Sequence, residues 1–251
     1  MEKGLIKKCF RRSIPTYDDH ALVQKIICEK LIGFLNIRGN YFQKVLEIGA
    51  GTGLLTKIML EHIKVREYIV NDLVEETEPV IKKVMKNGDC PDWTFLPGDA
   101  EIINVPGNLD LVVSGSTIQW FTKCDLFFNK LAGNMNKGGL FAFNLFGKRN
   151  YIESRSLTGL GLHYPEREEI ENMLKNHFEI LISQEEIIKM KFPDPAAVLN
   201  HFRKTGVNGL NESGWTKTKW IEFIKNYKYQ FLYEDGVALT YHPLYFVAQK
   251  K

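Results

Sequence analysis

Glycine and acidic side chains mark the stretch of this sequence that is best suited to binding a ligand. Gly49, Gly51 and Gly53 alternate with other residues just after Glu47, and a further acidic residue, Asp72, follows roughly 20 residues on. Glycines let the backbone turn sharply and approach a ligand closely, because they carry no Cβ. An acidic residue at this separation is placed to accept hydrogen bonds from ribose hydroxyls. The pattern therefore predicts a site for the nucleoside end of a cofactor.

A strand and a helix must hold this turn in place. The apolar residues in 44–48 predict a buried parallel strand, and residues 53–63 carry apolar side chains at helical spacing. The helix then points its positive N-terminal end at a ligand lying over the carboxyl end of the strand. A second strand, 67–71, ends at the same edge. The candidate cofactor contacts at this edge are Gly49, Ala50, Gly51, Gly53, Asp72 and Leu73.

The spacing of the glycines distinguishes two classes of cofactor. The dinucleotide fingerprint is G-x-G-x-x-G, with its third glycine beneath a pyrophosphate, whereas this sequence has G-x-G-x-G preceded by Glu47. That pattern resembles motif I of the class I S-adenosylmethionine (SAM) methyltransferases. Glu47 would lie beside the cationic methionyl ammonium or sulfonium of SAM, and it would repel a pyrophosphate. SAM is therefore the expected cofactor, and a nicotinamide-dependent dehydrogenase is disfavoured.

Up to Phe146 the chain alternates strand and helix patterns. The further expected strands are 93–96, 109–114 and 140–146, and the further expected helices are 76–87 and 124–135, with a turn at 136–139. This alternation predicts an α/β fold with a doubly wound, mostly parallel sheet. The third strand is followed by Asp99 and Ala100, where methyltransferases of this class hold the adenine. Ser114 ends the fourth strand and is a further candidate for a cofactor contact.

The pattern changes in the second half of the chain. A helix is expected at 166–176, a strand within 178–192, helices at 195–205 and 217–234, and a final strand at 237–247. Two helices thus stand where the plain methyltransferase fold has a hairpin, and a lid over the active-site mouth is the natural role for such an insert. The expected segments are an N-terminal helical segment over the cofactor site (1–36), a SAM-binding core (37–192), a helical lid insert (193–234) and the final strand of the core sheet (235–251).

Four further residues are candidates for contacts with the reacting groups. Residues 14–36 carry apolar side chains at helical spacing and predict a helix packed on the sheet. Tyr17 and Gln24 lie on this segment and would roof the methionyl end of the cofactor. Gln119 and Trp120 follow the fourth strand, in the crevice where open α/β sheets bind ligands. For Trp120 the alternative role is ordinary core packing. Gln119 lies on a turn at the end of the strand, which favours a functional role for its side chain.

Composition and motif spacing argue against several other classes of protein. The net charge of +3 is too small to indicate a nucleic-acid-binding protein, and no Asn/Asp-Pro-Pro-aromatic tetrad follows the fourth strand. The four cysteines lack C-x-x-C spacing and the six histidines lack ligand spacing, so no metal site is predicted. No apolar run reaches transmembrane length, and the basic N-terminal residues lack the apolar core of a signal peptide. The expected location is cytoplasmic.

A narrower family resemblance covers nearly everything from Phe10 to Val247. Besides the glycine turn, the segments that carry it are 10–24, 98–101, 118–120, 192–208 and 239–242. Together they are similar to the malonyl-[acyl-carrier-protein] O-methyltransferases of biotin synthesis. The most discriminating pieces are Gln119-Trp120 and residues 204–208. One departure is at 73–77, which lacks the methionine common at the head of the next helix.

The resemblance implies methyl transfer from SAM to the free carboxylate of a malonyl thioester. The methyl ester masks the charge, so that fatty-acid synthesis enzymes can elongate the chain toward pimeloyl thioester. A carboxylate with a solution pKa of about 4 is already ionised at neutral pH, so its attack needs no general base. The expected catalytic residues, Tyr17, Gln119 and Trp120, therefore position the carboxylate and exclude water.

The implied partner is malonyl-acyl carrier protein. Because a carrier protein is acidic, it should dock on a basic rim near the pocket entrance. The two candidate clusters are Lys7, Lys8, Arg11 and Arg12 near the N-terminus, and Lys189, Lys191, Arg203 and Lys204 on or near the insert. Arg155 is an alternative partner for the substrate carboxylate. The protein is expected to be a monomer without a nucleic-acid or membrane partner.

Two other functions are compatible with the sequence. One is a SAM methyltransferase for another small carboxylic acid or metabolite, because residue spacing does not show pocket specificity. The other is a module that binds SAM without turnover, against which an aromatic-lined pocket with Gln119 and Trp120 argues. The sequence also leaves open whether malonyl is carried on a protein or on coenzyme A.

Overall fold

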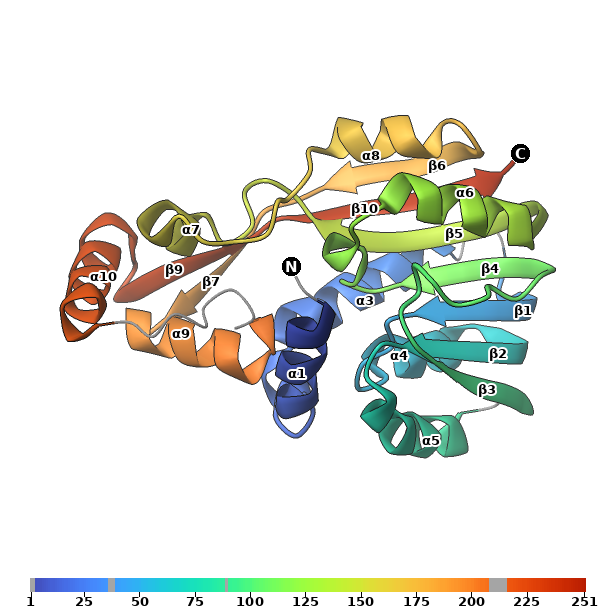
Figure 1. Cartoon of the computed structure of the whole chain (residues 1–251), viewed down its shortest axis with the longest axis horizontal. Helices are drawn as coiled ribbons and strands as arrows, with labels where there is room; N and C mark the ends of the chain where they lie inside the picture. Colours follow the sequence, from blue (N-terminus) through green and yellow to red (C-terminus); the bar gives the residue numbers. More distant parts are fainter. Residues whose placement is uncertain (1–2, 36–38, 89, 208–215) are drawn as a thin grey trace.

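A seven-stranded sheet forms the centre of the computed structural model, which describes residues 3–35, 39–88, 90–207 and 216–251 (Figure 1). In spatial order its strands are β3 (Asp92–Pro97), β2 (Lys64–Asp72), β1 (Tyr41–Ile48), β4 (Leu109–Ser114), β5 (Met135–Phe146), β10 (Pro243–Lys250) and β6 (Phe178–Glu185). Every pairing among the first five is parallel, and β10 runs antiparallel to both of its neighbours. This arrangement confirms the doubly wound, mostly parallel sheet predicted from the sequence.

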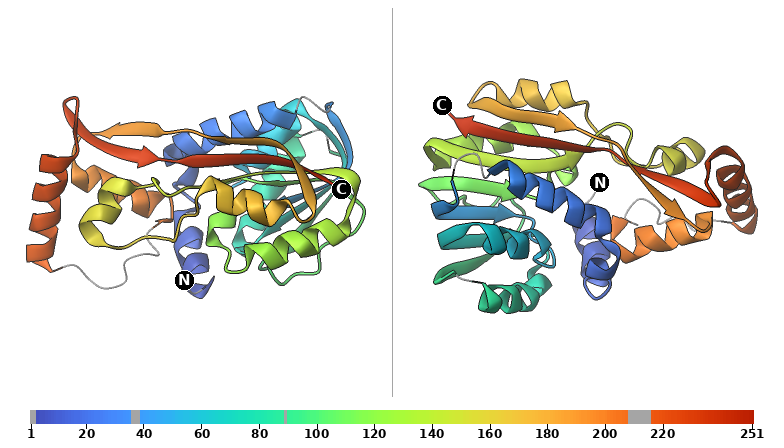
Figure 2. Two further views of the ribbon diagram at one scale, coloured as in Figure 1. Left: turned by 90° about the horizontal axis from the view of Figure 1, so that it is seen from above. Right: turned by 180° about the vertical axis from the view of Figure 1, so that it is seen from behind.

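Helices cover both faces of this sheet (Figure 2). One face packs against α3 (Leu22–Leu35), α4 (Leu54–His62) and α5 (Glu78–Asn87), and the other against α6 (Cys124–Asn134) and α8 (Arg167–Leu174). Successive side chains of a strand point to opposite faces, so Leu111 and Val113 of β4 pack beneath α3 and α4, while Val112 packs on the side of α6. Central strands covered on both sides therefore need continuous apolar runs, as the sequence has at 109–114.

A smaller three-stranded sheet continues outward from the first (Figure 1). In it, β9 (Gly236–Tyr241) pairs antiparallel with both β7 (Ile188–Phe192) and β8 (Leu232–Tyr233). The helices around this extension are α7 (Ile152–Thr158), α9 (Pro195–Lys204) and α10 (Lys217–Gln230). Aromatic residues fill its core, among them Tyr151, Tyr227 and Tyr241. Two N-terminal helices, α1 (Lys3–Ser13) and α2 (Tyr17–His20), lie between the extension and the parallel strands.

Several boundaries differ from the sequence prediction. The stretch 237–247, expected as one final strand, forms β9 and β10, which belong to different sheets and meet at His242. The expected turn at 136–139 lies inside β5, and the expected helix 217–234 ends at Gln230 because the chain enters the small sheet at β8. The stretch 178–192 likewise contributes one strand to each sheet. The errors at 178–192, 217–234 and 237–247 share a cause, since a second sheet has no separate signature in the local pattern.

The N-terminal segment also has more parts than expected. The predicted helix 14–36 is divided at Ala21 into α2 and α3, and α1 precedes them. The proposed division into four segments stays a prediction, and both its boundary at 36/37 and residues 208–215 of the expected lid lie outside the described residues. Within the described ranges, no helix has the length and apolar character needed to cross a membrane.

Candidate active site

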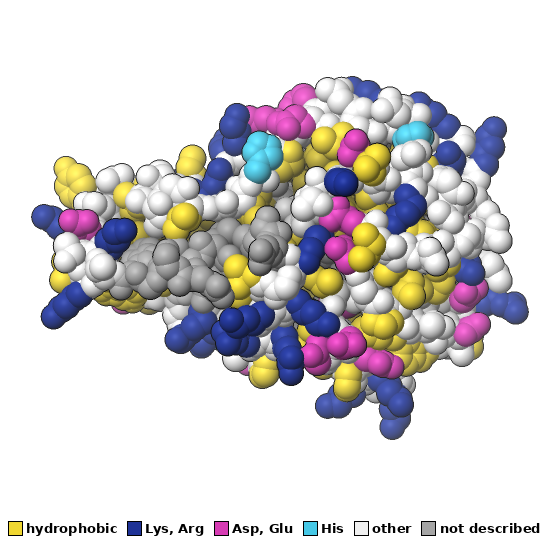
Figure 3. Space-filling model, in the orientation of Figure 1, with side chains coloured by type: hydrophobic (Ala, Val, Ile, Leu, Met, Phe, Trp, Pro, Cys, Tyr) yellow, Lys and Arg dark blue, Asp and Glu magenta, His cyan; other side chains and the backbone are white. Residues whose placement is uncertain are grey.

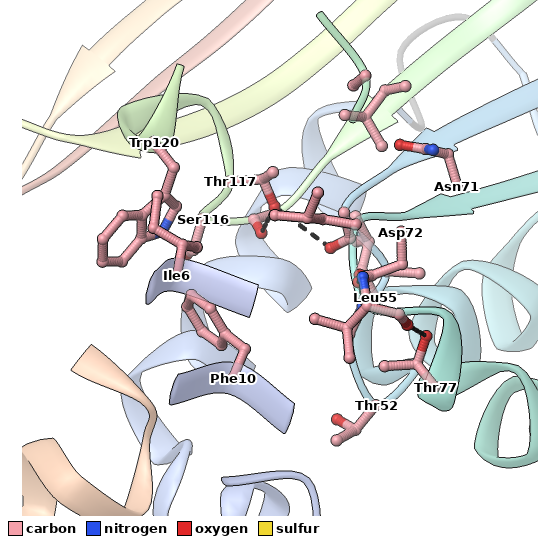
Figure 4. A pocket seen from close by; sticks show the side chains of 18 of the residues that line it. Ile6, Phe10, Thr52, Leu55, Asn71, Asp72, Thr77, Ser116, Thr117 and Trp120 are labelled. Carbon is pink, nitrogen blue, oxygen red and sulfur yellow. Dashed lines mark hydrogen bonds between the residues drawn. The ribbon is translucent and has the colours of Figure 1, made fainter. Parts of the chain in front are cut away.

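A large cavity lies over the carboxyl ends of β1, β2 and β4 and contains about 1030 Å³ of space, including its open mouth. Its floor comes from four loop segments, 48–52, 71–74, 98–100 and 115–117. Ile6 and Phe10 of α1 face these segments from the opposite side, together with Trp120 from the 3-10 turn Ile118–Trp120 (Figure 4). The rings of Phe10 and Trp120 meet edge to face at 5.4 Å. The sequence prediction had assigned no site role to Ile6 or Phe10, although the apolar residues of 3–13 recur at helical spacing.

The glycine turn forms one wall of this cavity. Gly49, Gly51 and Gly53 all have positive φ angles, of 70°, 57° and 82°. The amides of Gly49 and Ala50 both donate to the carbonyl of Asn71, at 2.9 and 3.0 Å, which fixes the turn against β2. A Cβ on Gly51 would enter open space, so the backbone is bare where a ligand approaches. Gly53 precedes α4 and does not line the cavity.

Asp72 connects the end of β2 to the glycine turn. One carboxylate oxygen accepts from the amide of Gly51 at 2.7 Å, and the other accepts from the amide of Val74 at 2.7 Å. The side chain is only 7% exposed, and burial raises its pKa to about 6. Each carboxylate oxygen retains further acceptor capacity for a ligand hydroxyl. Asp72 and Leu73 therefore line the cavity in the position that the sequence predicted.

Asp99 and Ala100 line the part of the cavity near β3, as predicted. Ion pairs between α1 and the opposite rim close the cavity here. Lys3 pairs with Glu101 at 2.7 Å and with Asp99 at 3.4 Å, while the pairs farther along the helix are Lys7 with Glu75 at 3.2 Å and Arg11 with Glu76 at 3.1 Å. The basic residues of α1 thus hold the helix over the cavity, a role that the sequence alone did not show.

Glu47 and Ser114 were both predicted to contact the cofactor. Neither lines the cavity. The carboxylate of Glu47 lies beneath the turn, where it accepts from the Thr56 hydroxyl at 2.8 Å and the Tyr68 hydroxyl at 2.6 Å. The Ser114 hydroxyl donates to the carbonyl of Ile48 at 3.0 Å. The structure therefore places both residues as supports of the strand ends, and the contact between Glu47 and a methionyl group stays a prediction.

We expect that Glu47→Gln will stabilise the protein at alkaline pH. Glu47 is fully buried, one of its oxygens has no partner among the described residues, and burial raises its pKa from 4.5 to about 7. A raised carboxyl pKa means that the folded state loses stability as the pH rises from about 4.5 through about 7. Urea unfolding at pH 8 should show a gain of about 1–3 kcal/mol for the variant. The gain should shrink toward zero near pH 4.5, and a gain that grows on acidification would contradict this account.

A second, smaller cavity of about 350 Å³ adjoins the first. Both cavities are lined by Phe10, Tyr17, Gln24, Ser116 and Trp120. The second is completed by Gln119, Phe146, Tyr151, Leu162, Tyr164, Thr205 and Val207. The structure thereby brings together Tyr17, Gln119 and Trp120, the three predicted catalytic residues. None of the described residues that line this cavity carries a charged side chain.

The polar groups of the second cavity are neutral hydrogen-bonding groups. Burial raises the pKa of Tyr17 far above its usual value and that of Tyr164 to about 12, so both hydroxyls keep their protons. The Gln119 amide donates to the carbonyl of Ser116 at 2.5 Å. Arg155 does not line the cavity; its guanidinium donates to the Lys148 and Asn150 carbonyls and lies 5.0 Å from the Tyr164 ring centre.

Comparison with known proteins identifies the family to which this chain belongs. A family model described as a methyltransferase domain matches residues 45–139. A malonyl-[acyl-carrier protein] O-methyltransferase of Bacteroides thetaiotaomicron is 38% identical, over 100% of this chain and 99% of the relative. The chain belongs to the malonyl-[acyl-carrier protein] O-methyltransferase family. A relative of the same name from Chlorobium luteolum is 36% identical and covers 100% of this chain and 96% of its own.

This chain shares its fold with solved structures of low sequence identity. The YcgJ protein from Bacillus subtilis superposes with a TM-score of 0.62 at 14% identity, over 88% of this chain and 97% of its own. The matched methyltransferase domain begins in β1 and ends in β5, and so includes the glycine turn, Asp72 and Asp99.

Among the described residues, no group of three or more His, Cys, Asp or Glu side chains could hold a metal ion.

Proposed function

We propose that this protein transfers the methyl group of SAM to the free carboxylate of malonyl-acyl carrier protein, giving the methyl ester that primes pimeloyl and biotin synthesis. The observation that carries this proposal is the neutral lining of the second cavity. An acceptor hydroxyl or amine would need a base to remove its proton, whereas a carboxylate is already an anion at neutral pH. Family membership and the family name support the choice of malonyl thioester.

The first cavity fits the nucleoside end of SAM. Asp72 presents acceptors for ribose hydroxyls, Asp99 and the Ala100 backbone lie where an adenine would be held, and Gly51 leaves space for close approach. When bound, SAM supplies a methyl group on a positively charged sulfur. The protein residues bind and orient this group, and no protein nucleophile or base is required.

The second cavity fits the acceptor carboxylate. Tyr17 and Tyr151 carry hydroxyls whose raised pKa values keep them as hydrogen-bond donors. Neutral donors can orient a carboxylate without a cation that would draw electron density from the attacking oxygen. Trp120 and Phe146 are aromatic walls that exclude water, which strengthens the attraction between the carboxylate and the cationic donor. Catalysis then depends on proximity and alignment.

Intact-mass analysis of malonyl-acyl carrier protein, incubated with SAM and the enzyme, tests the proposal. We expect a mass gain of one methyl group on the malonyl form and no gain on the acetyl or unloaded carrier. Methylation of free malonate or another small acid, with none on the carrier, would instead favour the second function, a methyltransferase for a small carboxylic acid. SAM binding without transfer to any of these acceptors would favour the non-catalytic module.

A basic rim beside the second cavity is the proposed dock for the acidic carrier. The end of α1 contacts the end of α9, where the Thr16 hydroxyl donates to the Lys204 carbonyl at 3.0 Å, and the next residue, Thr205, lines the second cavity. Figure 3 shows Lys and Arg side chains gathered over this region. We define the basic rim as Arg12, Arg203 and Lys204. No described carboxylate pairs with any of the three.

The other predicted basic residues have carboxylate partners or lie apart from the rim. Lys7 and Arg11 pair with Glu75 and Glu76 across the first cavity. Lys191 pairs with Glu234 at 2.9 Å and Asp235 at 2.8 Å in the small sheet. Their charges are thus partly offset within the molecule, which leaves the basic rim as the stronger positive surface beside the cavity.

Reversing two charges of the rim should weaken recognition of the carrier selectively. For Arg203→Glu/Lys204→Glu we expect the KM for malonyl-carrier protein to rise about tenfold or more, because like charges now oppose the acidic partner. The KM for malonyl N-acetylcysteamine thioester, which has no carrier, should stay within about twofold. The matched control is Lys225→Glu/Lys228→Glu on α10, with the same change in net charge. Docking at the rim would be contradicted if the KM for malonyl N-acetylcysteamine thioester rose as much as the KM for the carrier. It would also be contradicted if Lys225→Glu/Lys228→Glu raised the KM for the carrier equally.

A further inference from the structure

A serine with a left-handed backbone lies where the two cavities meet. Ser116 is in the loop after β4, lines both cavities and has a φ of 52° (Figure 4). A residue with a side chain adopts this conformation only at a cost, so it persists where its surroundings hold it. Here the amide of Ser116 donates to Asn144 Oδ1 at 2.9 Å, and its carbonyl accepts from Gln119 Nε2 at 2.5 Å. Two side chains thus hold the backbone of Ser116 in place.

The hydrogen bond to the backbone also determines how the Ser116 hydroxyl is oriented. A backbone N–H can only donate, so the oxygen of the Asn144 amide must face it. The Nδ2 group of Asn144 then faces the hydroxyl, and it donates to Oγ at 3.1 Å. Asn144 is fully buried in β5 and lines neither cavity, so it supports Ser116 from within the sheet. One lone pair of Oγ is thereby used, and the hydroxyl hydrogen points elsewhere.

The hydroxyl hydrogen of Ser116 has no acceptor among the described residues. A ligand at the junction of the cavities can therefore accept it. A carboxylate is a strong acceptor, and both reactants of the proposed reaction carry one, since SAM has a carboxylate at its methionyl end. The position at the junction favours the carboxylate of the malonyl group. Its oxygen must meet the methyl group there, whereas the methionyl carboxylate is separated from the sulfur by a short carbon chain.

We propose that the Ser116 hydroxyl binds the malonyl carboxylate and that Asn144 is the positioning residue that directs this hydroxyl. The inference rests on the proposed function, because it takes a malonyl thioester as the acceptor. In the transfer, one carboxylate oxygen forms a bond to the methyl carbon while the carbon–sulfur bond breaks and its electron pair stays on sulfur, so no proton moves. A hydrogen bond to the other oxygen keeps the attacking oxygen directed at the methyl group. Because the carboxylate loses its charge in the reaction, this hydrogen bond is strongest before transfer and contributes mainly to substrate binding.

Steady-state kinetics of Ser116→Ala with malonyl-carrier protein and with malonyl N-acetylcysteamine thioester test the proposal. We expect the KM to rise about tenfold for both substrates, because both carry the same carboxylate, and kcat to change by less than about threefold. The rim variant, in contrast, should affect only the carrier. The Kd for SAM in calorimetric titration should stay within about twofold. Ser156→Ala is the matched control, since its hydroxyl donates to the Glu153 carbonyl at 3.0 Å and Ser156 lines neither cavity.

The variant Ser116→Gly allows the role of Asn144 to be tested. It removes the hydroxyl, as Ser116→Ala does, but glycine adopts the left-handed conformation readily. It should therefore have the same KM as Ser116→Ala and at least the same stability in urea. Asn144→Ala should raise the KM about threefold to tenfold in the wild type. When added to Ser116→Gly it should raise the KM less than about twofold, because no hydroxyl remains to be directed and no strained backbone to be held.

Three results would overturn the proposal. Wild-type KM values in folded Ser116→Ala would show that the hydroxyl does not bind the malonyl carboxylate, and Ser116→Gly decides in the same assay if Ser116→Ala does not fold. A Kd for SAM that rises as much as the KM would assign the hydroxyl to the methionyl carboxylate instead. Equal effects of Asn144→Ala with and without Ser116→Gly would show that Asn144 does not act through Ser116. A wild-type protein that methylates neither malonyl substrate would refute the proposed function itself, so the two failures remain distinguishable.

Discussion

Asp72→Asn should weaken SAM binding by about tenfold to 100-fold. The carboxylate accepts from two backbone amides, those of Gly51 and Val74, both at 2.7 Å. An asparagine of the same shape has only one acceptor oxygen, so in either orientation one buried N–H of the backbone faces another N–H. An unpaired buried donor costs about 1–3 kcal/mol, and the lost acceptor for a ribose hydroxyl costs a similar amount. The unpaired donor lowers the free energy of unfolding of the free and the bound protein alike, so the loss in Kd comes from the ribose acceptor and amounts to about one to two factors of ten.

The pH dependence of binding gives an independent check on Asp72. Burial raises its pKa to about 6 in the folded protein, so the carboxylate takes up a proton as the pH falls through that value. Titration calorimetry should therefore show the Kd of the wild type for SAM rising below pH 6. The Kd of Asp72→Asn should change much less over the same range, because the amide does not titrate there.

Asp110→Asn is the matched control for this prediction. Asp110 also accepts a backbone hydrogen bond, from the amide of Lys44 at 3.1 Å, but it lies near the start of β4 and does not line the cavity. We expect its replacement to lower the free energy of unfolding without changing the Kd for SAM. Binding by Asp72→Asn within threefold of the wild type would contradict the proposed role of the carboxylate.

The parts of the site that sequence analysis predicted correctly are those determined by nearby residues. Positive φ angles at Gly49 and Gly51 follow from a sharp turn between a strand and a helix, and glycine is the residue type that adopts them readily. Asp72 follows a strand whose apolar residues identify it as central, so its place at the carboxyl edge follows from the parallel topology. Local residue type and strand direction were therefore sufficient to predict that the glycine turn and Asp72 line the first cavity.

Glu47 shows that a correctly predicted strand does not by itself determine which face of the strand a side chain occupies. Side chains alternate between the two faces of a strand, so neighbours point in opposite directions. Ile48 reaches the cavity edge, whereas Glu47 points beneath α4 to Thr56 and Tyr68. The motif located the carboxylate along the chain, but the helix packing that decides which face it occupies was not readable from the spacing.

The acceptor side of the site depends on contacts between residues far apart in the sequence. Tyr151, His201 and Tyr241 are separated by about 40 to 50 residues each, and they meet only in the folded aromatic core of the second sheet. Of the three, Tyr151 lines the second cavity, and no local pattern marks it as part of the site. His201 is buried and its imidazole Nε2 is within hydrogen-bonding distance of the Tyr241 hydroxyl, so it is part of the aromatic core.

Gly49→Ala should remove SAM binding and also lower stability, whereas Gly51→Ala should mainly affect binding. A Cβ on Gly49 would lie 2.2 Å from the Thr117 hydroxyl oxygen and 2.4 Å from its methyl group. Thr117 cannot readily move away, because its hydroxyl donates to the carbonyls of Gly49 and Gly115 at 3.2 and 3.1 Å. The left-handed backbone adds strain of about 1–2 kcal/mol for any residue with a side chain.

The clash with Thr117 and the strain of the left-handed backbone lead to different expected stabilities for the two variants. For Gly49→Ala we expect the free energy of unfolding to fall by about 2–4 kcal/mol, since overpacking adds to the backbone strain. For Gly51→Ala we expect only the strain, about 1–2 kcal/mol, because no atom lies within 4 Å of the added Cβ. Its methyl group nevertheless enters open space at a residue that lines the cavity, so the Kd for SAM should rise at least about tenfold. Urea unfolding and titration calorimetry on both variants separate the two effects.

A double variant tests whether contact with Thr117 causes the larger loss of stability expected for Gly49→Ala. Thr117→Gly removes all three atoms that the new Cβ of Gly49→Ala would meet, at 2.2, 2.4 and 2.7 Å. The double variant Gly49→Ala/Thr117→Gly should therefore lose less stability than the sum of the two single changes, because the clash is absent. Purely additive losses would show that the backbone conformation of the turn, and not its contact with Thr117, is what excludes a side chain at residue 49.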